Sequence, residues 1–489
     1  MLEVVRAQTG RALALLMAVV GLCAVGVGTA EGAAGLQPFP FDVKPLLAED
    51  QIGRVVPVEE IAKGLDPAAI TYYQRTFKTS DAETRRRLID QGRVVGLPAE
   101  LSRRFGDRFG GVWYDNERGH WVVAVTRGSS LPTVREALRE LTLDESAAAV
   151  EEVPLSASAR TALAGRLDVE LRERLGGRNV TVSAPRDAIE AIVSPKLPDD
   201  AVELARSVIE ERLAAEAPEV PYDIARLEIS GGVNAVACSS QSYFLPFNYI
   251  HQCNEFIAGG QDWEHNNPPV AGRELCTAGF LSGPPSYYDP YFMTAGHCNS
   301  WAGNGVGYNA CKPATPTAVT CGAIGTQVNN YWYTAFNGDG MLLHMTNFGY
   351  WGYPLGRWWN WSTSTYTQLQ YWWPWNGAAG DNGSAPIGTI VCRNGHSGTS
   401  CGEIKNNNMG VIWTEAGNAL TYTIWVEGMC SVVGDSGSPV TQAYQATAVG
   451  LAVYVPPVGG NGTTCASPPV TVVEPVGRVA SVTGVVPYG

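Results

Sequence analysis

Three short segments in the second half of the chain carry residue types that can do chemistry together. They are TAGHC with His297, NGDG with Asp339, and GDSGSP with Ser436. A serine is a weak nucleophile at neutral pH, so it needs a base that takes its proton. A histidine titrates in the right range for that task, and a buried carboxylate holds its tautomer and stabilises its charged form. The three residues therefore predict a hydrolase that attacks an acyl group through a serine.

The order of these residues along the chain narrows the class of hydrolase. His, Asp, Ser is the order of chymotrypsin-like proteases, whereas subtilisins run Asp, His, Ser and α/β-hydrolases run Ser, Asp, His. The G-x-S-x-G elbow of the last class is absent, because residue 438 is serine. The backbone N–H groups of Gly434 and Ser436 are expected to form the oxyanion hole, since glycine tolerates the backbone conformation that such a turn needs. Each segment alone fits an ordinary turn, but the three in this order favour catalysis.

The elements that must position these residues have the pattern of short strands. From Gly232 onward, apolar runs rich in Val, Thr, Tyr and Trp alternate with Gly, Asn, Pro and Ser at close intervals. Many short strands separated by turn residues predict an all-β sandwich or barrel. Helical periodicity returns only at Val473–Thr483.

Residues 31–231 have a different pattern, in which helices and strands alternate. Ser80–Gln91 begins with a capping residue, with Glu83 three positions later as in a capping box. The segment Val112–Thr126 predicts a β-hairpin. Leu131–Leu143 and Ala201–Ala215 have the periodicity of amphipathic helices. This part is predicted to be α+β, and it contains no catalytic constellation.

Charge divides the chain at the same place. The formal charge is −13, from 34 Lys and Arg against 47 Asp and Glu, which excludes a typical nucleic-acid-binding protein. Twelve of the 14 tryptophans follow Gly232. The residues before and after Gly232 therefore differ so much in composition that they are predicted to fold as two separate units. Only six basic residues lie from that point onward, namely Arg273, Lys312, Arg357, Arg393, Lys405 and Arg478.

Cysteine is confined almost entirely to the second half. Of 11 cysteines, one lies near the N-terminus and none occurs again until Cys238. An even number in one half predicts a disulfide framework in an oxidising compartment. The alternative is zinc binding, but no C-x2-C pair exists and Cys298 alone stands beside a histidine. No metal and no other cofactor is therefore expected.

The N-terminus has the pattern of a cleaved secretory signal. Arg6 and Arg11 precede an apolar run over residues 12–27, and the small residues Gly28 and Ala30 stand at plausible −3 and −1 positions. The run is short for a membrane-spanning helix, which needs about 20 residues. The rival interpretation is lipid attachment to the cysteine within the run, which lacks the small residue that usually precedes it. We expect secretion into the extracellular medium, with no membrane contact after cleavage.

The second half resembles bacterial chymotrypsin-fold serine proteases of the α-lytic protease and streptogrisin type. The six-residue step from Cys430 to Ser436 is a feature of that branch. FGDRFGGVWYDNERGHWVVAVT, residues 105–126, resembles a motif of the pro-region of the family. The remaining motifs that carry the resemblance are YFMTAGHC (Tyr291–Cys298), NGD (Asn337–Asp339), VCRNGHSGTSCG (Val391–Gly402), CSVVGDSGSP (Cys430–Pro439) and the tail VEPVGRVASVTG.

The resemblance implies a fold, a function and a division of the chain. It implies two six-stranded antiparallel β-barrels for the mature enzyme, preceded by the α+β pro-region. The expected parts are a signal peptide over 1–30, a pro-region over 31–231 and a protease domain over 232–489. Because Ile257-Ala-Gly-Gly resembles the mature start of the family, the pro-region alternatively extends to 256. The implied function is that of a secreted, monomeric serine endopeptidase that cleaves protein and peptide substrates.

The resemblance also implies disulfide pairs. Three pairs follow from it directly: Cys276–Cys298, Cys392–Cys401 and Cys430–Cys465. The pairs Cys238–Cys253 and Cys311–Cys321 follow only as the nearest remaining cysteines.

The family alignment places four residues in the substrate pocket, namely Ser431, Ala452, Val453 and Tyr454. Basic P1 side chains need a carboxylate at the pocket base, where this chain has Cys430 and Ser431. Glutamate-specific relatives have a histidine where this chain has Ala452. A small-to-medium or aromatic apolar P1 residue is therefore expected. The chain departs from the family at Ser438, where a glycine is usual, and at Val453 and Val455, where Ser-x-Gly is usual.

Trp351–Trp375 matches no family segment and holds seven of the 14 tryptophans. Exposed tryptophans suit carbohydrate rings or partner proteins. This leaves an alternative function, a non-catalytic binding protein on a protease scaffold. The presence of all three catalytic residue types favours the enzyme, and packing over a barrel is the simpler expectation for the tryptophans.

Overall fold

The computed structural model describes most of the first half of the chain and separate segments of the second. The predicted signal peptide, the pro-region boundary and the Cys238–Cys253 pair lie outside it. Residues 39–489 form one compact unit. The described residues are 44–226 except 177–178, then 262–265, 274–299, 309–313, 321–328, 338–345, 357–360, 362–363, 365–374, 385–409, 412–413, 419–432, 434–444, 446–454, 465 and 469–489.

The predicted hairpin is confirmed and belongs to a three-stranded sheet. Strands β1 (Phe109–Asp115) and β2 (His120–Thr126) pair antiparallel, and β3 (Ala148–Val153) lies parallel to β2. The Asp115 carboxylate accepts the N–H groups of Glu117 and Arg118 at 3.0 and 2.9 Å. Such a local hydrogen bond favours a turn, so it fixes where the strands reverse.

Short helices precede and follow the strands of this sheet in the chain. In α4 (Asp81–Gly92) the hydroxyl of the N-cap Ser80 accepts the N–H of Glu83 at 3.3 Å, as the sequence predicts. In a full capping box the Glu83 carboxylate would also accept the N–H of Ser80. Here the carboxylate accepts from Arg86 and Arg87 instead. The other helices here are α2 (Val58–Gly64), α3 (Pro67–Phe77), α5 (Leu97–Phe105) and α6 (Leu131–Glu140), with short 3-10 turns at Ala48–Asp50 and Gly106–Arg108.

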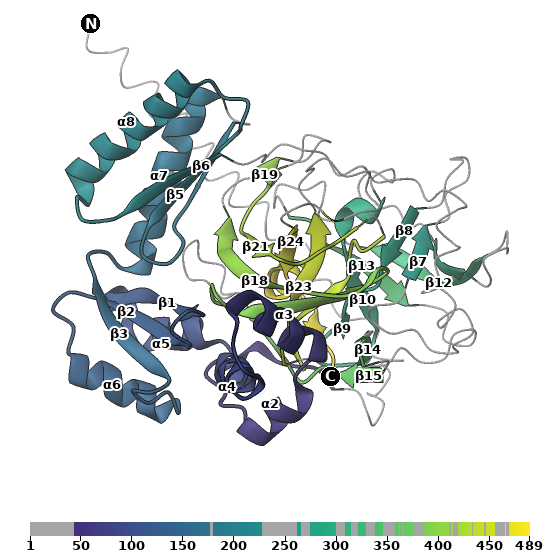
Figure 1. Ribbon diagram of the computed structural model, residues 1–489. Helices are drawn as coiled ribbons and strands as arrows, with labels where there is room; N and C mark the ends of the chain where they lie inside the picture. Colours follow the sequence, from purple (N-terminus) through teal and green to yellow (C-terminus); the bar gives the residue numbers. More distant parts are fainter. Residues whose placement is uncertain are drawn as a thin grey trace, which may run out of the picture. The chain divides into compact units, whose positions relative to one another are not determined.

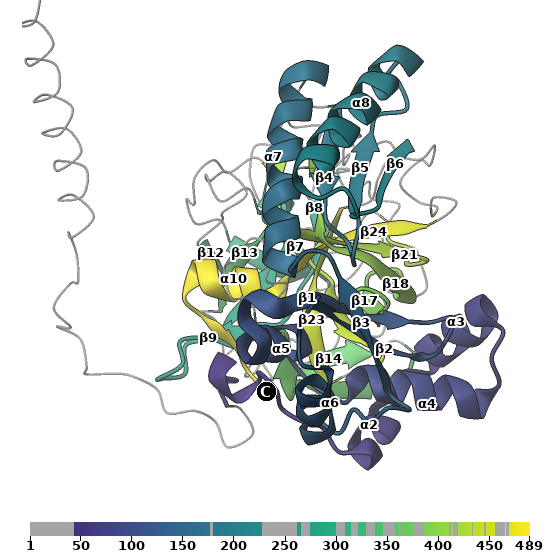
Figure 2. The ribbon, with the colours of Figure 1, turned by 90° about the vertical axis from the view of Figure 1, so that its left-hand side faces the viewer.

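A second α+β layer follows in the chain. Helices α7 (Ala157–Leu175) and α8 (Asp199–Glu216) lie side by side against one face of the sheet β4–β5–β6 (Figure 2). Their apolar stripes and the sheet share a core that includes Leu167, Ile189 and Ile209. The strands are Val180–Ser183, Ile189–Val193 and Tyr222–Arg226. The predicted helix at Ala201–Ala215 is confirmed as part of α8.

The second half of the chain contains a closed six-stranded antiparallel barrel (Figure 1). The pairing runs β17–β18–β21–β24–β23–β22 and returns to β17, so no strand of the ring has a free edge. A short strand, β16 (Tyr371–Trp372), adds to β23 in parallel. The ring strands are Ile390–Gly395, Gly398–Met409, Thr423–Glu427, Val470–Pro475, Thr447–Tyr454 and Pro439–Gln442, in ring order.

Eight further strands of the second half form a sheet in the order β25–β9–β10–β13–β12–β11–β7–β8. No pairing closes this sheet among the residues that the structure describes, so of the two expected barrels the structure establishes one. Two further two-stranded ribbons are β14–β15 (Arg357–Asn360, Thr365–Gln368) and β19–β20 (Ile412–Trp413, Ala419–Leu420). The eight strands are Val486–Pro487, Leu281–Gly283, Tyr291–Thr294, Met341–Met345, Cys321–Val328, Asn309–Pro313, Asp262–His265 and Glu274–Thr277.

The tail of the chain differs from the sequence prediction in one respect. Helix α10 begins at Val476, and Val473–Pro475 belong to strand β24. Pro475 explains the change, because a proline fits before a helix but cannot donate within one. Among the described residues, no helix is long and apolar enough to cross a membrane.

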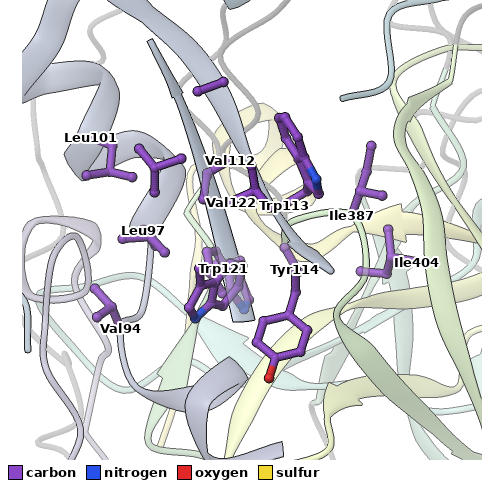
Figure 3. Close-up of a cluster of buried hydrophobic side chains, with 14 of the residues drawn as sticks. Val94, Leu97, Leu101, Val112, Trp113, Tyr114, Trp121, Val122, Ile387 and Ile404 are labelled. Carbon is purple, nitrogen blue, oxygen red and sulfur yellow. The ribbon is translucent and has the colours of Figure 1, made fainter. Parts of the chain in front are cut away.

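The sheet β1–β2–β3 and the barrel share one hydrophobic core. The N–H of Tyr114 donates to the Ile387 carbonyl at 2.9 Å, and Trp113 forms a parallel bridge with Ile387. Figure 3 shows Trp113 and Tyr114 beside Ile387 and Ile404, with Trp121 on the neighbouring strand. The amide of Asn116 donates to the Gly388 carbonyl at 2.7 Å. The barrel therefore buries part of its outer surface against the preceding α+β region.

Candidate active site

Two neighbouring strands bring His297 and Asp339 together. His297 lies in a 3-10 turn, Gly296–Asn299, directly after β10, and Asp339 stands just before β13. The two strands pair antiparallel with Thr294 opposite Met341. The end of one strand and the start of the other therefore meet at the same edge of the sheet.

His297 joins Asp339 to Ser436 through both of its ring nitrogens. Nδ1 lies 2.7 Å from Asp339 Oδ2, and Nε2 lies 2.7 Å from Ser436 Oγ. The backbone N–H of His297 also donates to Asp339 Oδ1 at 2.9 Å. Because Asp339 is fully buried and accepts from Nδ1–H, Nε2 is left as the acceptor for the serine proton. Ser436 remains half-buried, so a substrate can reach its hydroxyl.

The turn that carries Ser436 depends on two glycines in the left-handed region. Gly434 has φ +95° and Gly437 has φ +86°. A Cβ at Gly437 would lie 2.1 Å from Thr294 Oγ1 and 2.3 Å from the Thr277 carbonyl oxygen. Only glycine fits there, and the turn is pressed against the sheet that carries His297.

The same turn leaves two N–H groups unused. The amides of Asp435, Gly437 and Ser438 donate to backbone carbonyls at 2.7–3.0 Å. In the part of the chain that the structure describes, no hydrogen bond uses the N–H of Gly434 or Ser436. These are the two groups that the sequence predicts for an oxyanion hole.

A buried ion pair holds this turn from the barrel side. Arg393 and Asp435 are both about 1% exposed, with Nη1 and Oδ1 2.5 Å apart. Ser397 and the N–H of Val432 satisfy the remaining carboxylate lone pairs. Burial lowers the pKa of the Arg393 guanidinium, and the charge of Asp435 opposes that shift. Sequence reasoning missed this pair, although Arg393 is one of very few basic residues in the second half.

A second carboxylate lies behind Asp339. Glu474, fully buried on β24, accepts the backbone N–H of Asp339 at 3.2 Å. Arg478 Nη1 lies 3.6 Å from Glu474 Oε1 and balances its charge. Little in the sequence signals this pair, because Glu474 lies near the end of a strand and Arg478 lies in the helix that follows it.

The expected pocket residues lie on both sides of the Ser436 turn. The hydroxyls of Ser431 and Thr471 are 2.9 Å apart, and both are buried. Ala452 pairs with the turn through the N–H groups of Gly437 and of Ala452 itself, at 2.7 and 2.9 Å. Val453 is buried in the core. Tyr454 ends β23, and its side chain lies outside the described residues.

The described residues include three disulfides, and they are the pairs that the resemblance implies directly. Cys276–Cys298 ties β8 to the turn of His297, Cys392–Cys401 bridges directly opposed residues of β17 and β18, and Cys430–Cys465 adjoins the Ser436 turn. Cys311 and Cys321 lie in the paired strands β11 and β12, but the description of the structure does not extend to their side chains.

The Trp-rich segment is only partly described. Trp372 and Trp373 are buried, as packing over the barrel predicts, and Trp372 Nε1 donates to the Leu46 carbonyl at 2.9 Å. The side chains of its other tryptophans lie outside the description. Within the described ranges, no group of three or more His, Cys, Asp and Glu side chains is placed to hold a metal ion.

Comparison with known proteins gives one family match. Residues 82–137 match the family model "Alpha-lytic protease pro N-terminal". No curated protein sequence matches the chain. Residues 82–137 of the α+β region are thus of the α-lytic protease pro-region type, and they stand ahead of the closed six-stranded barrel.

Solved structures show weak overall similarity. Chymotrypsin of Cellulomonas bogoriensis is 22% identical, with a TM-score of 0.33 and coverage of 47% of this chain and 98% of that chain. The α-lytic protease homologue N4 is 20% identical, with the same coverage and TM-score. The MamO protease domain of Magnetospirillum magneticum is 14% identical, with a TM-score of 0.27 and coverage of 46% and 96%.

Proposed function

We propose that the chain is the precursor of a secreted serine endopeptidase. The observation that carries the proposal is the continuous chain of short contacts from Asp339 through His297 to Ser436. The proposed parts are a signal peptide over 1–30, a pro-region over 31–231 and a protease domain over 232–489. Ser436 is the nucleophile, His297 the general base and acid, and Asp339 the group that orients the histidine.

The geometry supports an acyl-enzyme mechanism. Ser436 Oγ attacks the carbonyl carbon of the scissile peptide while its proton passes to His297 Nε2. The C–N bond then breaks as His297 gives that proton to the leaving amine. A water molecule attacks the acyl-enzyme, loses a proton to His297 and releases the acid, and Ser436 recovers the proton.

The two free N–H groups supply the electrostatic part of the mechanism. The oxyanion that forms in each step carries a full charge, and donors already oriented toward it stabilise it without reorganisation. Gly434 and Ser436 offer such donors. Asp435 is already paired with Arg393 in the uncut chain, so the Ser436 turn is ordered before cleavage. Asp435 therefore does not need the ammonium group of a newly formed N-terminus as its partner.

An uncharged P1 side chain fits the pocket residues. Thr471 Oγ1 donates to the Met429 carbonyl at 2.9 Å, so it accepts from Ser431. This leaves Ser431 Oγ with lone pairs and no formal charge. Such a group neither neutralises a basic P1 residue nor donates to an acidic one, which favours a small-to-medium or aromatic apolar P1 residue.

The pro-region is proposed to assist folding and then to inhibit. An all-β fold closed by distant contacts folds slowly, because loop closure costs entropy before long-range pairing stabilises anything. A partner that already presents a complementary apolar surface lowers that barrier. The shared core around Trp113 and Ile387 supplies such a surface.

The function is tested by covalent labelling and substitution. An organophosphate is expected to modify Ser436 alone and to abolish peptide hydrolysis. Ser436→Ala, released by an added protease, is expected to fold normally and to lose at least about three orders of magnitude in kcat. A chain that is not labelled and hydrolyses no peptide would favour the binding protein. A Ser436→Ala variant with parental turnover would exclude Ser436 as the nucleophile.

A further inference from the structure

Thr277 is a fully buried residue that touches the Ser436 turn from the opposite sheet. It ends strand β8 of the sheet that carries His297, next to the disulfide of Cys276 with Cys298. The turn that it contacts belongs to the barrel. Nothing in the sequence motifs singles it out, and the mechanism proposed above gives it no role.

Both the main chain and the side chain of Thr277 bond this turn. Its N–H donates to the Ser436 carbonyl at 2.8 Å, and its Oγ1 donates to the Gly434 carbonyl at 2.8 Å. One residue thus holds the carbonyls of the two residues whose N–H groups are unused. These two bonds lie within two residues of each other on the turn, so they fix it at two points.

The hydroxyl of Thr277 is itself fixed. It accepts the N–H of His396 at 3.3 Å, so its donor and one of its lone pairs are both occupied. The Thr277 carbonyl accepts Thr294 Oγ1 at 2.9 Å. The hydroxyl therefore points at Gly434 in a single orientation, set by three neighbouring segments.

Gly434 needs such support more than any other residue of the turn. With φ +95° and no side chain, its peptide planes have more freedom than those of any other residue type. Asp435, the next residue, is held by Arg393, and Gly437 is held by the Ala452 carbonyl. On the Gly434 side, the Thr277 hydroxyl is the contact that sets the direction of the carbonyl.

We propose that Thr277 is a positioning residue that aligns the N–H groups of Gly434 and Ser436 as oxyanion donors. The inference rests on the serine protease function proposed above. It adds that donor alignment depends on the docking of the two β-sheets, because the clamp comes from one and the donors from the other. Thr277 touches no substrate and acts only through this turn.

The test replaces the hydroxyl of Thr277 in the full-length chain, and the kinetics are measured after the pro-region has been removed. Thr277→Val keeps the shape of the side chain and removes the donor. Loss of one oxyanion donor costs about 10²–10³ in kcat, so misalignment is expected to cost about tenfold or more. KM is expected to change less than about twofold, because alignment matters in the transition state and not for ground-state binding. Thr277→Ser, which keeps the hydroxyl, is expected to restore kcat.

Two further readouts separate positioning from a general structural effect. The acid limb of the pH profile of kcat/KM is expected to stay in place, because among the described residues Thr277 makes no hydrogen bond to His297 or Asp339. Thr441→Val is the matched control: Thr441 is fully buried on β22, and its Oγ1 has no hydrogen-bond partner among the described residues. That variant is expected to keep the parental kcat.

The outcomes decide the inference independently of the proposed function. The parent enzyme is measured alongside, and its active sites are counted by organophosphate labelling of Ser436. That measurement shows whether the protein is a protease. A folded Thr277→Val variant with parental kcat overturns the role of Thr277. Equal losses in Thr277→Val and Thr441→Val overturn it too. If Thr277→Val does not fold, Thr277→Cys serves instead, because a thiol is a weaker donor, and it must show a lower kcat than Thr277→Ser.

Discussion

At the scale of single residues, the Ser436 turn is held by charge as well as by hydrogen bonds. Arg393 and Asp435 lie almost completely out of water, where an unpaired charge is very costly. The pair also bonds Ser397 and the Cys430 carbonyl, so it links two loops of the barrel to the turn. Stability and catalytic geometry therefore depend on the same two side chains.

Arg393→Gln is expected to lower both the stability of the protein and its activity. It leaves the Asp435 carboxylate buried without a countercharge, which typically costs about 3–5 kcal/mol. Thermal unfolding and kcat/KM measured on the same sample check this. The double variant Arg393→Gln with Asp435→Asn removes both charges, and it is expected to regain part of the stability but not the activity. If the double variant is no more stable than the single one, the charge argument is wrong.

The proposed catalytic residues could be identified in the sequence because their chemistry is bound to short motifs. His297, Asp339 and Ser436 are each marked by neighbours in the chain. Thr277 and Glu474 are not, because their roles depend on which distant backbone groups they meet. Arg393 is intermediate: the motif that contains it was recognised in the sequence, but its ion-pair partner Asp435 was not.

At the scale of elements, the tight turns separate two effects of glycine. Gly398, at the β17–β18 turn, and Gly437 have similar φ values, +95° and +86°. No atom lies within 4 Å of a Cβ built at Gly398, whereas at Gly437 backbone and side chain lie within 2.3 Å. The first position needs glycine for its backbone conformation alone, and the second for space as well.

Alanine at each position is expected to show the difference. Gly398→Ala should cost about 1–2 kcal/mol of unfolding free energy, which is the cost of a left-handed conformation. Gly437→Ala should cost more and should abolish activity, because the turn must move away from Thr294 and Thr277. Denaturant unfolding and peptide hydrolysis measure the two effects. Equal stability of the two variants would show that the packing at Gly437 is looser than the structure describes.

Helix α4 contains a carboxylate whose environment disfavours its charge. Burial raises the pKa of Asp90 to about 6, although Arg86 and Arg93 oppose the shift. Between about pH 4 and 6 the folded state therefore binds more protons than the unfolded state, so this group makes stability fall as pH rises through that window.

Asp90→Asn is expected to remove this pH dependence. The variant should be more stable than the parent by about 1 kcal/mol above pH 6, since it no longer buries a charge, with part of the gain lost because the bond from Arg86 weakens. Amide hydrogen exchange in α4, compared between variant and parent at each pH, is the measurement. A parent whose α4 gains protection as pH rises from 4 to 6 would contradict the sign.

The hairpin and the helices α4, α6 and α8 were predicted because local signals mark them, whereas α2, α3, α5 and α7 were not predicted. The Ser80 cap and the turn at Asp115 both act within a few residues. The start of α10 was misplaced because strand β24 and the helix are both apolar, and only Pro475 separates them. Whether the first β-sheet closes into a barrel is likewise a matter of long-range pairing, which periodicity does not encode.

At the scale of the whole molecule, pro-region and barrel are joined by more than one apolar core. A second core combines Ile61 and Leu65 with Tyr371, Tyr444 and the Cys392–Cys401 disulfide. The sequence could not show this, because an apolar side chain that packs on another domain looks the same as one in its own core.

The Glu60 carboxylate joins two tyrosines of this second interface. Glu60 Oε1 accepts the hydroxyls of Tyr371 at 3.0 Å and Tyr444 at 2.5 Å, and both rings are buried. The backbone then continues the contact, since the N–H of Asp66 donates to the Ala443 carbonyl at 2.9 Å. Farther upstream, Leu46 pairs with Pro487 of the other sheet. The segment over residues 44–66 thus touches both β-sheets of the second half.

Glu60→Ala is expected to loosen the hold of this segment on the protease. It strands two buried hydroxyls, and each unsatisfied group costs about 1–3 kcal/mol. In the full-length chain, made uncleavable by Ser436→Ala, the Asp66 amide should exchange with deuterium at least about tenfold faster, because 1.4 kcal/mol corresponds to a factor of ten. Glu59→Ala is the matched control, since Glu59 is exposed on the same helix and α2 gains the same residue type. Exchange at the Leu46 amide shows whether the segment over residues 44–66 opens as one unit. It should become faster together with exchange at Asp66 if the whole segment is released at once, and it should stay slow if the two contacts open separately. Equal exchange at Asp66 in Glu60→Ala and Glu59→Ala would mean that apolar burial alone holds the pro-region in place.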